Sequence, residues 1–142
     1  MIDPKTAPYG VLALRIALGV MFLAHGLLKV FVFTVPGTVG FFQSIGYPAV
    51  AAYFTIGAEI AGGIALIAGI LPRLVAAALV PVLIGATLVH IPNGWLFTSA
   101  NGGWEYPAFL AVASAVQALL GDGPATLLRS ERLLPQLRPA QA

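Results

Sequence analysis

The hydrophobic pattern of the chain consists of four long apolar runs separated by short segments rich in glycine, proline or charged residues. We expect these runs to form helices over about residues 9–33, 49–71, 74–91 and 106–120. Most of them approach or reach the roughly 20 residues with which an α-helix crosses a bilayer. The fourth is the shortest and begins near Tyr106, because Pro107 suits the first helical turn and disfavours helical geometry in the residue before it. The pattern predicts an all-α membrane protein, a bundle of four transmembrane helices.

The segments between the runs differ in their polar residues. Residues 34–48 carry no charge and mix glycine and proline with aromatic residues, which predicts an interfacial loop or re-entrant piece. We expect a second loop over residues 92–103, which are rich in Asn, Gly and Trp, and a tight turn at residues 72–73. The end of the chain alternates Arg with Leu, which predicts a short amphipathic segment on the membrane surface. We therefore expect a lead over residues 1–8, a transmembrane domain over 9–123 and a tail over 124–142.

Composition supports a membrane protein and excludes several kinds of site. Hydrophobic residues make up 59% of the chain, charged residues only 8%, and the mean hydropathy is +0.95, whereas soluble domains carry about 25% charged residues. The chain has no cysteine, which excludes disulfides, thiolate metal sites and iron–sulfur clusters within it. We find no metal, haem or flavin motif and no basic cluster of the kind that binds nucleic acid.

The basic residues predict how the chain is oriented. Apart from Lys29, they lie near the start of the first run, in the second connection and in the tail, at Lys5, Arg15, Arg73, Arg129, Arg132 and Arg138. The first and third connections have none. The positive-inside rule therefore predicts that both termini are cytoplasmic. We expect Arg15 itself to be an interface anchor whose long side chain extends toward the cytoplasmic surface.

Five ionisable residues from four different runs are expected to lie in the same half of the bundle. At a rise of about 1.5 Å per residue, His25, Lys29, Glu59, His90 and Glu105 all fall toward the non-cytoplasmic side. An unpaired charge at the bilayer centre costs about 2.5–3.5 kcal/mol. We therefore predict that Lys29 pairs with Glu59 or Glu105, and that the histidines carry protons or donate hydrogen bonds. We expect the group to gather around Glu105; Lys29 extending outward, or a polar network that only clamps the helices, are the alternatives.

The residues that carry these features resemble the DoxX family. The resemblance rests on Arg15, Gly19, Phe22, His25-Gly26 and Lys29, on Glu59 with Gly62-Gly63, on His90, and on Asn101-Gly102-Gly103-Trp104-Glu105-Tyr106-Pro107. It implies a four-helix protein of the bacterial inner (cytoplasmic) membrane, whose relatives include a quinone-linked oxidoreductase subunit and membrane partners of redox enzymes. The chain departs from the family after Gly123, where an acidic residue often closes the motif.

Our first hypothesis for function is a membrane subunit of an oxidoreductase that holds a quinone head group or passes protons near it. Its electrons would come from a redox partner protein, since this chain has no electron-carrier motif. The residues expected to bind the quinone are His25, Lys29, Trp104 and Tyr106. The residues expected to act in catalysis are Glu59, His90 and Glu105.

Two other hypotheses assign the chain a different role. In one, the polar cluster only fixes the bundle, and the chain is a membrane scaffold that docks a partner or forms a homo-oligomer among membrane lipids. In the other, the chain carries protons or a small solute. Four short helices without an internal repeat cannot easily alternate access to the two sides, so a carrier would have to oligomerise.

Overall fold

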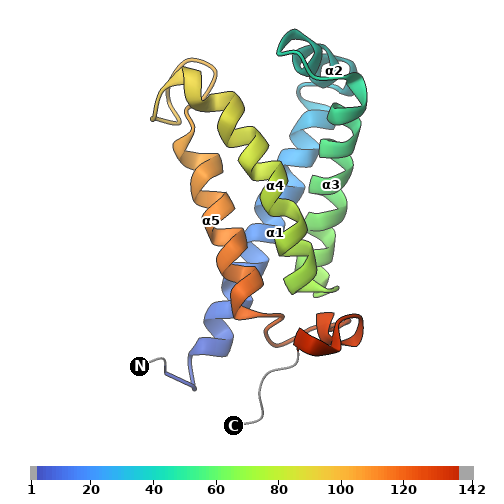
Figure 1. Ribbon diagram of the computed structural model, residues 1–142, viewed down its shortest axis with the longest axis vertical. Helices are drawn as coiled ribbons and strands as arrows, with labels where there is room; N and C mark the ends of the chain where they lie inside the picture. The colour runs from blue at the N-terminus through green and yellow to red at the C-terminus, as the bar shows by residue number, and fades with distance from the viewer. Residues whose placement is uncertain (1–2, 138–142) are drawn as a thin grey trace.

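The apolar runs form four long α-helices, and a short fifth helix lies between the first two of them in sequence (Figure 1). The computed structural model describes residues 3–137, so Arg138 lies outside the described residues. The α-helices are α1 (Ala7–Phe31), α2 (Val35–Ser44), α3 (Ala49–Ala68), α4 (Pro72–His90) and α5 (Glu105–Leu120). A single 3₁₀ turn at Ile91–Asn93 follows α4, and two more, at Ser130–Arg132 and Pro135–Leu137, come after α5. The ends of the four long helices lie within three residues of their predicted positions.

Length and composition make this arrangement compatible with a membrane bundle. Among residues 3–137, three segments are long and apolar enough to cross a membrane: Ala7–Phe31, Ala49–Ala68 and Pro72–Asn93. The last of the four long helices, α5, is apolar but has only 16 residues. Pro81 lies inside α4, which continues through it as one helix.

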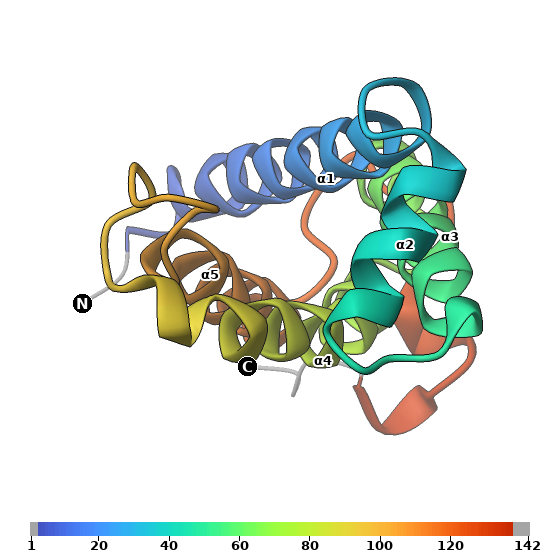
Figure 2. The same cartoon turned by 90° about the horizontal axis from the view of Figure 1, so that it is seen from above.

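Residues 35–44 form a helix, so of the two alternatives predicted for residues 34–48, a loop or a re-entrant piece, the loop is wrong for this stretch. Pro36 lies in the first turn of α2, where a missing N–H costs little. The Thr34 hydroxyl accepts a hydrogen bond from the Gly37 N–H at 3.2 Å and caps the helix. The helix lies across one end of the bundle (Figure 2). On its inner face the Thr38 hydroxyl donates to the Lys29 carbonyl at 3.1 Å, which ties α2 to the end of α1.

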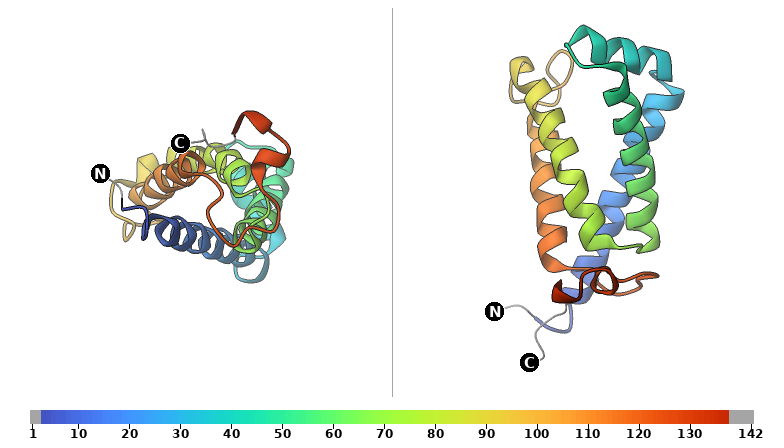
Figure 3. Two further views of the ribbon diagram at one scale, coloured as in Figure 1. Left: turned by 90° about the horizontal axis from the view of Figure 1, so that it is seen from below. Right: turned by 45° about the vertical axis from the view of Figure 1, so that its right-hand side comes forward.

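The bundle consists of two helix pairs, α1 with α3 and α4 with α5, whose members pack closely on each other. In the first pair, small residues let the backbones approach closely. A Cβ atom added at Gly63 would lie 2.6 Å from the backbone nitrogen of Leu23, and one at Gly19 would lie 3.0 Å from the Gly63 carbonyl. The two pairs are well separated at the end that carries α2 and closer at the opposite end, as the right-hand view of Figure 3 shows.

The apolar core joins the two pairs in the middle of the bundle. Its side chains come from four helices and are almost fully buried. They are Leu18, Phe22, Leu66, Ala76, Leu79, Leu83 and Leu110. The core lies between the end of the bundle that carries α2 and the end covered by the tail.

Arg15 is buried and holds the tail, so the prediction that it extends to the interface is wrong. Its side chain is 1% exposed. The two terminal nitrogens of its guanidinium donate to the carbonyls of Asp122, Pro124 and Ala125 at 2.9–3.0 Å and to the Thr126 hydroxyl at 3.2 Å. A guanidinium has five N–H donors in a fixed plane and suits such a set of oxygens. The segment after α5 is therefore fastened under the bundle (Figures 1 and 3).

The rest of the tail is fixed by two further residues. Asp122 accepts hydrogen bonds from the Arg73 and Ser130 N–H groups at 3.0 and 2.7 Å. The Arg73 side chain donates to the carbonyls of Ala118 and Leu119, which are left free at the end of α5. Through residue 137 the tail contains 3₁₀ turns and no α-helix, so the predicted amphipathic segment is not a helix over these residues.

Candidate functional site

A cavity of about 770 Å³ lies between the two helix pairs at the end that carries α2. Residues from all five α-helices and from the loop before α5 line it. Most of the lining is apolar. The polar lining residues are His25, Lys29, Thr38, Glu59, His90, Asn101 and Tyr106.

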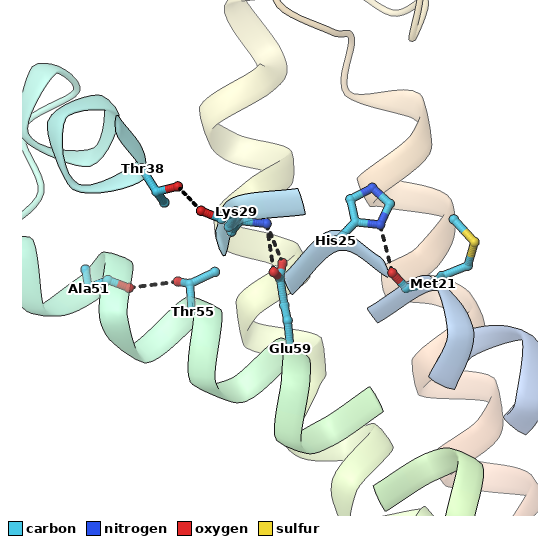
Figure 4. A network of polar contacts seen from close by, with 7 residues as sticks. All are labelled: Met21, His25, Lys29, Thr38, Ala51, Thr55 and Glu59. Carbon is cyan, nitrogen blue, oxygen red and sulfur yellow. Dashed lines mark hydrogen bonds and ion pairs between the residues drawn. The ribbon is translucent and has the colours of Figure 1, made fainter. Parts of the chain in front are cut away.

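Lys29 and Glu59 form an ion pair inside this cavity (Figure 4). The Lys29 Nζ lies 2.7 Å from Glu59 Oε2 and 2.9 Å from Oε1, so the ammonium donates to both oxygens. The side chains are 19% and 10% exposed. The prediction that Lys29 pairs with a glutamate of another helix is confirmed, and the alternative in which Lys29 extends outward is wrong.

His25 and His90 have the same local geometry on two different helices. The Nδ1 atom of each lies 2.7–2.8 Å from the carbonyl four residues earlier, Met21 for His25 and Ala86 for His90. A carbonyl can only accept, so Nδ1 donates in both, and the neutral ring keeps Nε2 as a free acceptor. Figure 4 shows the other ring nitrogen of His25 pointing away from Met21. Each histidine thus has one nitrogen fixed by its helix and one available to a ligand.

Tyr106 adds an aromatic face and a hydroxyl to the cavity. Its ring stacks on that of His25, with centroids 5.5 Å apart and planes at 26°. Its hydroxyl is buried and has no hydrogen-bond partner within residues 3–137. Buried hydroxyls of tyrosine usually have a partner. This donor is therefore available to a molecule in the cavity.

Trp104 is the residue before α5 and Glu105 is the first residue of that helix, and neither of them lines the cavity. The Glu105 carboxylate accepts from the Phe97 N–H at 2.8 Å. Trp104 packs edge-on against Trp95, with ring centroids 4.4 Å apart. The prediction that the ionisable groups gather around Glu105 is therefore wrong: Lys29 meets Glu59, and Glu105 shapes the loop.

The cavity also contains residues that the sequence did not single out. Thr38 lines it because residues 35–44 are helical, whereas the sequence pattern predicted a loop. Phe33, Phe41 and Phe97 line it and are 60%, 49% and 66% exposed, so they form its rim. An accumulation of phenylalanine in otherwise uncharged connections is the signal that could have identified this rim.

The chemistry available in the cavity is hydrogen bonding and proton transfer. An ammonium, a carboxylate, two imidazoles and a phenol meet in a mostly apolar space, which is typical of a small-molecule site. Within the described part of the chain, no three His, Asp or Glu side chains lie close enough together to hold a metal ion.

Comparison with known proteins agrees with the sequence resemblance. A stretch of 71 residues is 38% identical to a Bacillus subtilis (strain 168) protein named "Putative oxidoreductase CatD", covering 50% of this chain and 52% of that protein. The chain thus matches about half the length of this relative. No solved structure is significantly similar to the chain.

The family match covers the helices that provide most of the cavity's ionisable groups. Residues 10–91, more than half of the chain, match the family described as DoxX. This range contains His25, Lys29, Glu59 and His90, and it ends before the Asn101–Pro107 stretch. With three helices that can span a membrane, the chain is a multi-pass membrane protein, and it belongs to the DoxX family.

Proposed function

We propose that the chain is a membrane subunit of an oxidoreductase, and that its cavity binds the head group of a quinone. The observation that carries this proposal is the set of free hydrogen-bonding atoms around one apolar space: the buried Tyr106 hydroxyl and the Nε2 atoms of His25 and His90. The Tyr106 hydroxyl can donate to a quinone carbonyl, whereas the Nε2 atoms of neutral imidazoles can accept from the hydroxyls of the quinol. Reduction of the quinone to the quinol consumes protons. The volume of about 770 Å³ lies within the roughly 300–1,000 Å³ range of ligand pockets.

The rim of the cavity supports a ligand that is dissolved in the membrane. Phe33, Phe41 and Phe97 are 60%, 49% and 66% exposed, whereas Glu59 is 8% exposed. A molecule with a polar ring and an apolar tail fits this gradient, with the ring beside the Lys29–Glu59 pair and the tail across the phenylalanines. Aromatic side chains exposed in this way are stable in contact with lipid.

The redox reaction needs a partner. Reduction of a quinone to a quinol takes two electrons and two protons. This chain has no cysteine and no flavin or haem motif, so we assign the electrons to a partner redox protein and the protons to groups of the cavity. The relative's name, an oxidoreductase, supports this class of reaction. Bacterial origin, both termini in the cytoplasm and a site in the inner membrane are part of this proposal.

Quinone binding by the isolated chain tests the proposal. The chain is placed in lipid nanodiscs and titrated with a short-chain ubiquinone analogue, with tryptophan fluorescence as the signal, since Trp95 and Trp104 lie in the loop beside the cavity. We expect Tyr106→Phe to weaken binding about tenfold, because it removes the hydroxyl that can donate to a quinone carbonyl, a hydrogen bond of roughly 1 kcal/mol or more. Thr55→Val is the control, because its hydroxyl donates to the Ala51 carbonyl and it does not line the cavity. Absence of binding, or equal affinities in Tyr106→Phe and Thr55→Val, would contradict the proposal.

A scaffold role is the second candidate, and one observation favours it. Lys29 and Glu59 satisfy each other's charges, which is sufficient for a pair that only joins α1 to α3. In that case the chain would copurify with a partner protein, and cavity variants would lower the yield of the complex without changing the quinone turnover of each assembled complex.

A further inference from the structure

A second group of polar residues lies between the cavity and the tail. Ser114 and Gln117 are 0% exposed and Arg15 is 1% exposed. Ser114 and Gln117 are three residues apart on α5 and so share one face of that helix. The Gln117 Nε2 donates to the Gly121 carbonyl at 2.9 Å, and Arg15 donates to the adjacent Asp122 carbonyl at 3.0 Å. The two side chains therefore bond to adjacent carbonyls of the same turn. We call these three residues the Arg15 layer.

Each residue of the Arg15 layer has one buried polar atom without a protein partner among the described residues: Arg15 Nε, Ser114 Oγ and Gln117 Oε1. The first is a donor, the third an acceptor, and a hydroxyl can be either. Buried polar atoms are almost always hydrogen-bonded, to ordered water where no protein atom is in reach. A water needs two to four polar partners, and these three atoms are of complementary type. They are the observation from which internal water is inferred below.

The positive charge of Arg15 determines what this water can conduct. Its nitrogens contact carbonyl and hydroxyl oxygens, while the Asp122 carboxylate accepts from Arg73 and Ser130. The guanidinium stays protonated. A fixed positive charge of this kind is a barrier to protons in a hydrated channel.

On the cavity side the layer is covered by apolar residues. Phe22, Leu83 and Leu110 line the cavity and also belong to the buried core, with exposed fractions of 3%, 6% and 9%. Ser114 lies one helical turn beyond Leu110 on α5. On the other side, the segment that Arg15 fastens covers the end of the bundle (left view of Figure 3).

We propose that the Arg15 layer holds internal water and is a seal, so that the cavity exchanges water and protons only through its α2 end, beside the loop before α5. This inference rests on the proposed function in one respect: the protons of the quinone reaction are then taken up and released on that side alone. The seal itself requires no quinone.

The absence of cysteine from the chain makes the seal directly measurable. Single cysteines are introduced at Ala86 in the cavity and at Ser114 in the layer. Control cysteines at Ala100 in the loop and Gln136 in the tail report the orientation. The variants are reconstituted in liposomes, and a charged, membrane-impermeant methanethiosulfonate reagent is applied from each side, with labelling rates read by mass spectrometry.

We expect Ala86→Cys to react from the loop side and not from the tail side. Ser114→Cys is expected to react about tenfold or more slowly than Gln136→Cys from the tail side, because the reacting form is the thiolate and a thiol away from bulk water stays protonated. In Ser114→Cys, adding Arg15→Gln should raise the tail-side rate severalfold; Thr126→Ala, which removes one of the four bonds, is the milder variant if Arg15→Gln does not fold.

Two results would overturn the seal: tail-side labelling of Ala86→Cys, or tail-side labelling of Ser114→Cys as fast as that of Gln136→Cys. If the chain binds no quinone and Ala86→Cys is labelled from the loop side alone, the proposed function is refuted and the seal is supported. If the chain binds quinone and Ala86→Cys is labelled from both sides, the proposed function is supported and the seal is refuted.

Discussion

The Lys29–Glu59 pair gives a quantitative prediction about stability. At 2.7 Å and an effective dielectric constant of about 20, the attraction between unit charges is about 6 kcal/mol. Removing both charges from water costs several kcal/mol per ion, so the net value of the pair is small. Removing one partner leaves the other charge buried and alone. We therefore expect Lys29→Met or Glu59→Gln alone to lower the free energy of unfolding by about 3–5 kcal/mol.

The double variant should recover much of this loss, because it leaves no unpaired charge. We expect the double variant, Lys29→Met with Glu59→Gln, to lose about 3 kcal/mol less free energy of unfolding than the two single variants lose in sum. The assay is unfolding in mixed detergent and SDS micelles, followed by circular dichroism. Lys29→Met combined with Arg73→Met is the control, since these residues lie at opposite ends of the bundle and their effects should add within about 0.5 kcal/mol. A coupling between Lys29 and Glu59 no larger than that of the control would refute the reasoning.

Three further predictions concern the packing, the loop and the tail. Gly63→Ala should lower the free energy of unfolding by about 1–3 kcal/mol in the same assay, because its Cβ would meet the Leu23 backbone, whereas Gly57→Ala, with nothing within 4 Å, should not destabilise. Glu105→Ala should release the loop before α5 and increase quenching of tryptophan fluorescence by iodide; unchanged quenching would contradict the bond assigned to its carboxylate. Arg73→Met should speed tryptic cleavage of the tail severalfold, because three backbone carbonyls lose their donor, and a wild-type cleavage rate would count against that role.

The sequence predicted the long helices and the buried ion pair, because both follow from strong constraints. A charge on an apolar helix must find a partner in the bundle, which limited Lys29 to Glu59 or Glu105. The sequence could not choose between them. In the structure Lys29 pairs with Glu59, and the Glu105 carboxylate instead accepts a hydrogen bond from the Phe97 N–H.

The errors occurred where backbone groups are the partners. Arg15 has carbonyl oxygens as acceptors, and every residue has a carbonyl, so no side-chain pattern marks such a site. In α2, proline and glycine indicated a loop. The position of Pro36 in the first turn and the cap from Thr34 make a helix possible there. A proline in the first turn permits a helix, whereas a proline a few residues later would interrupt it.

The ion pair also affects how the chain is made. Lys29 emerges from the ribosome 30 residues before Glu59, so for this interval the first span holds a charge that cannot yet be neutralised. Its transfer to lipid in that state carries the cost of a lone charge in a bilayer. We therefore expect the insertion machinery to retain α1 until α3 arrives, so that the two spans enter the membrane as a pair.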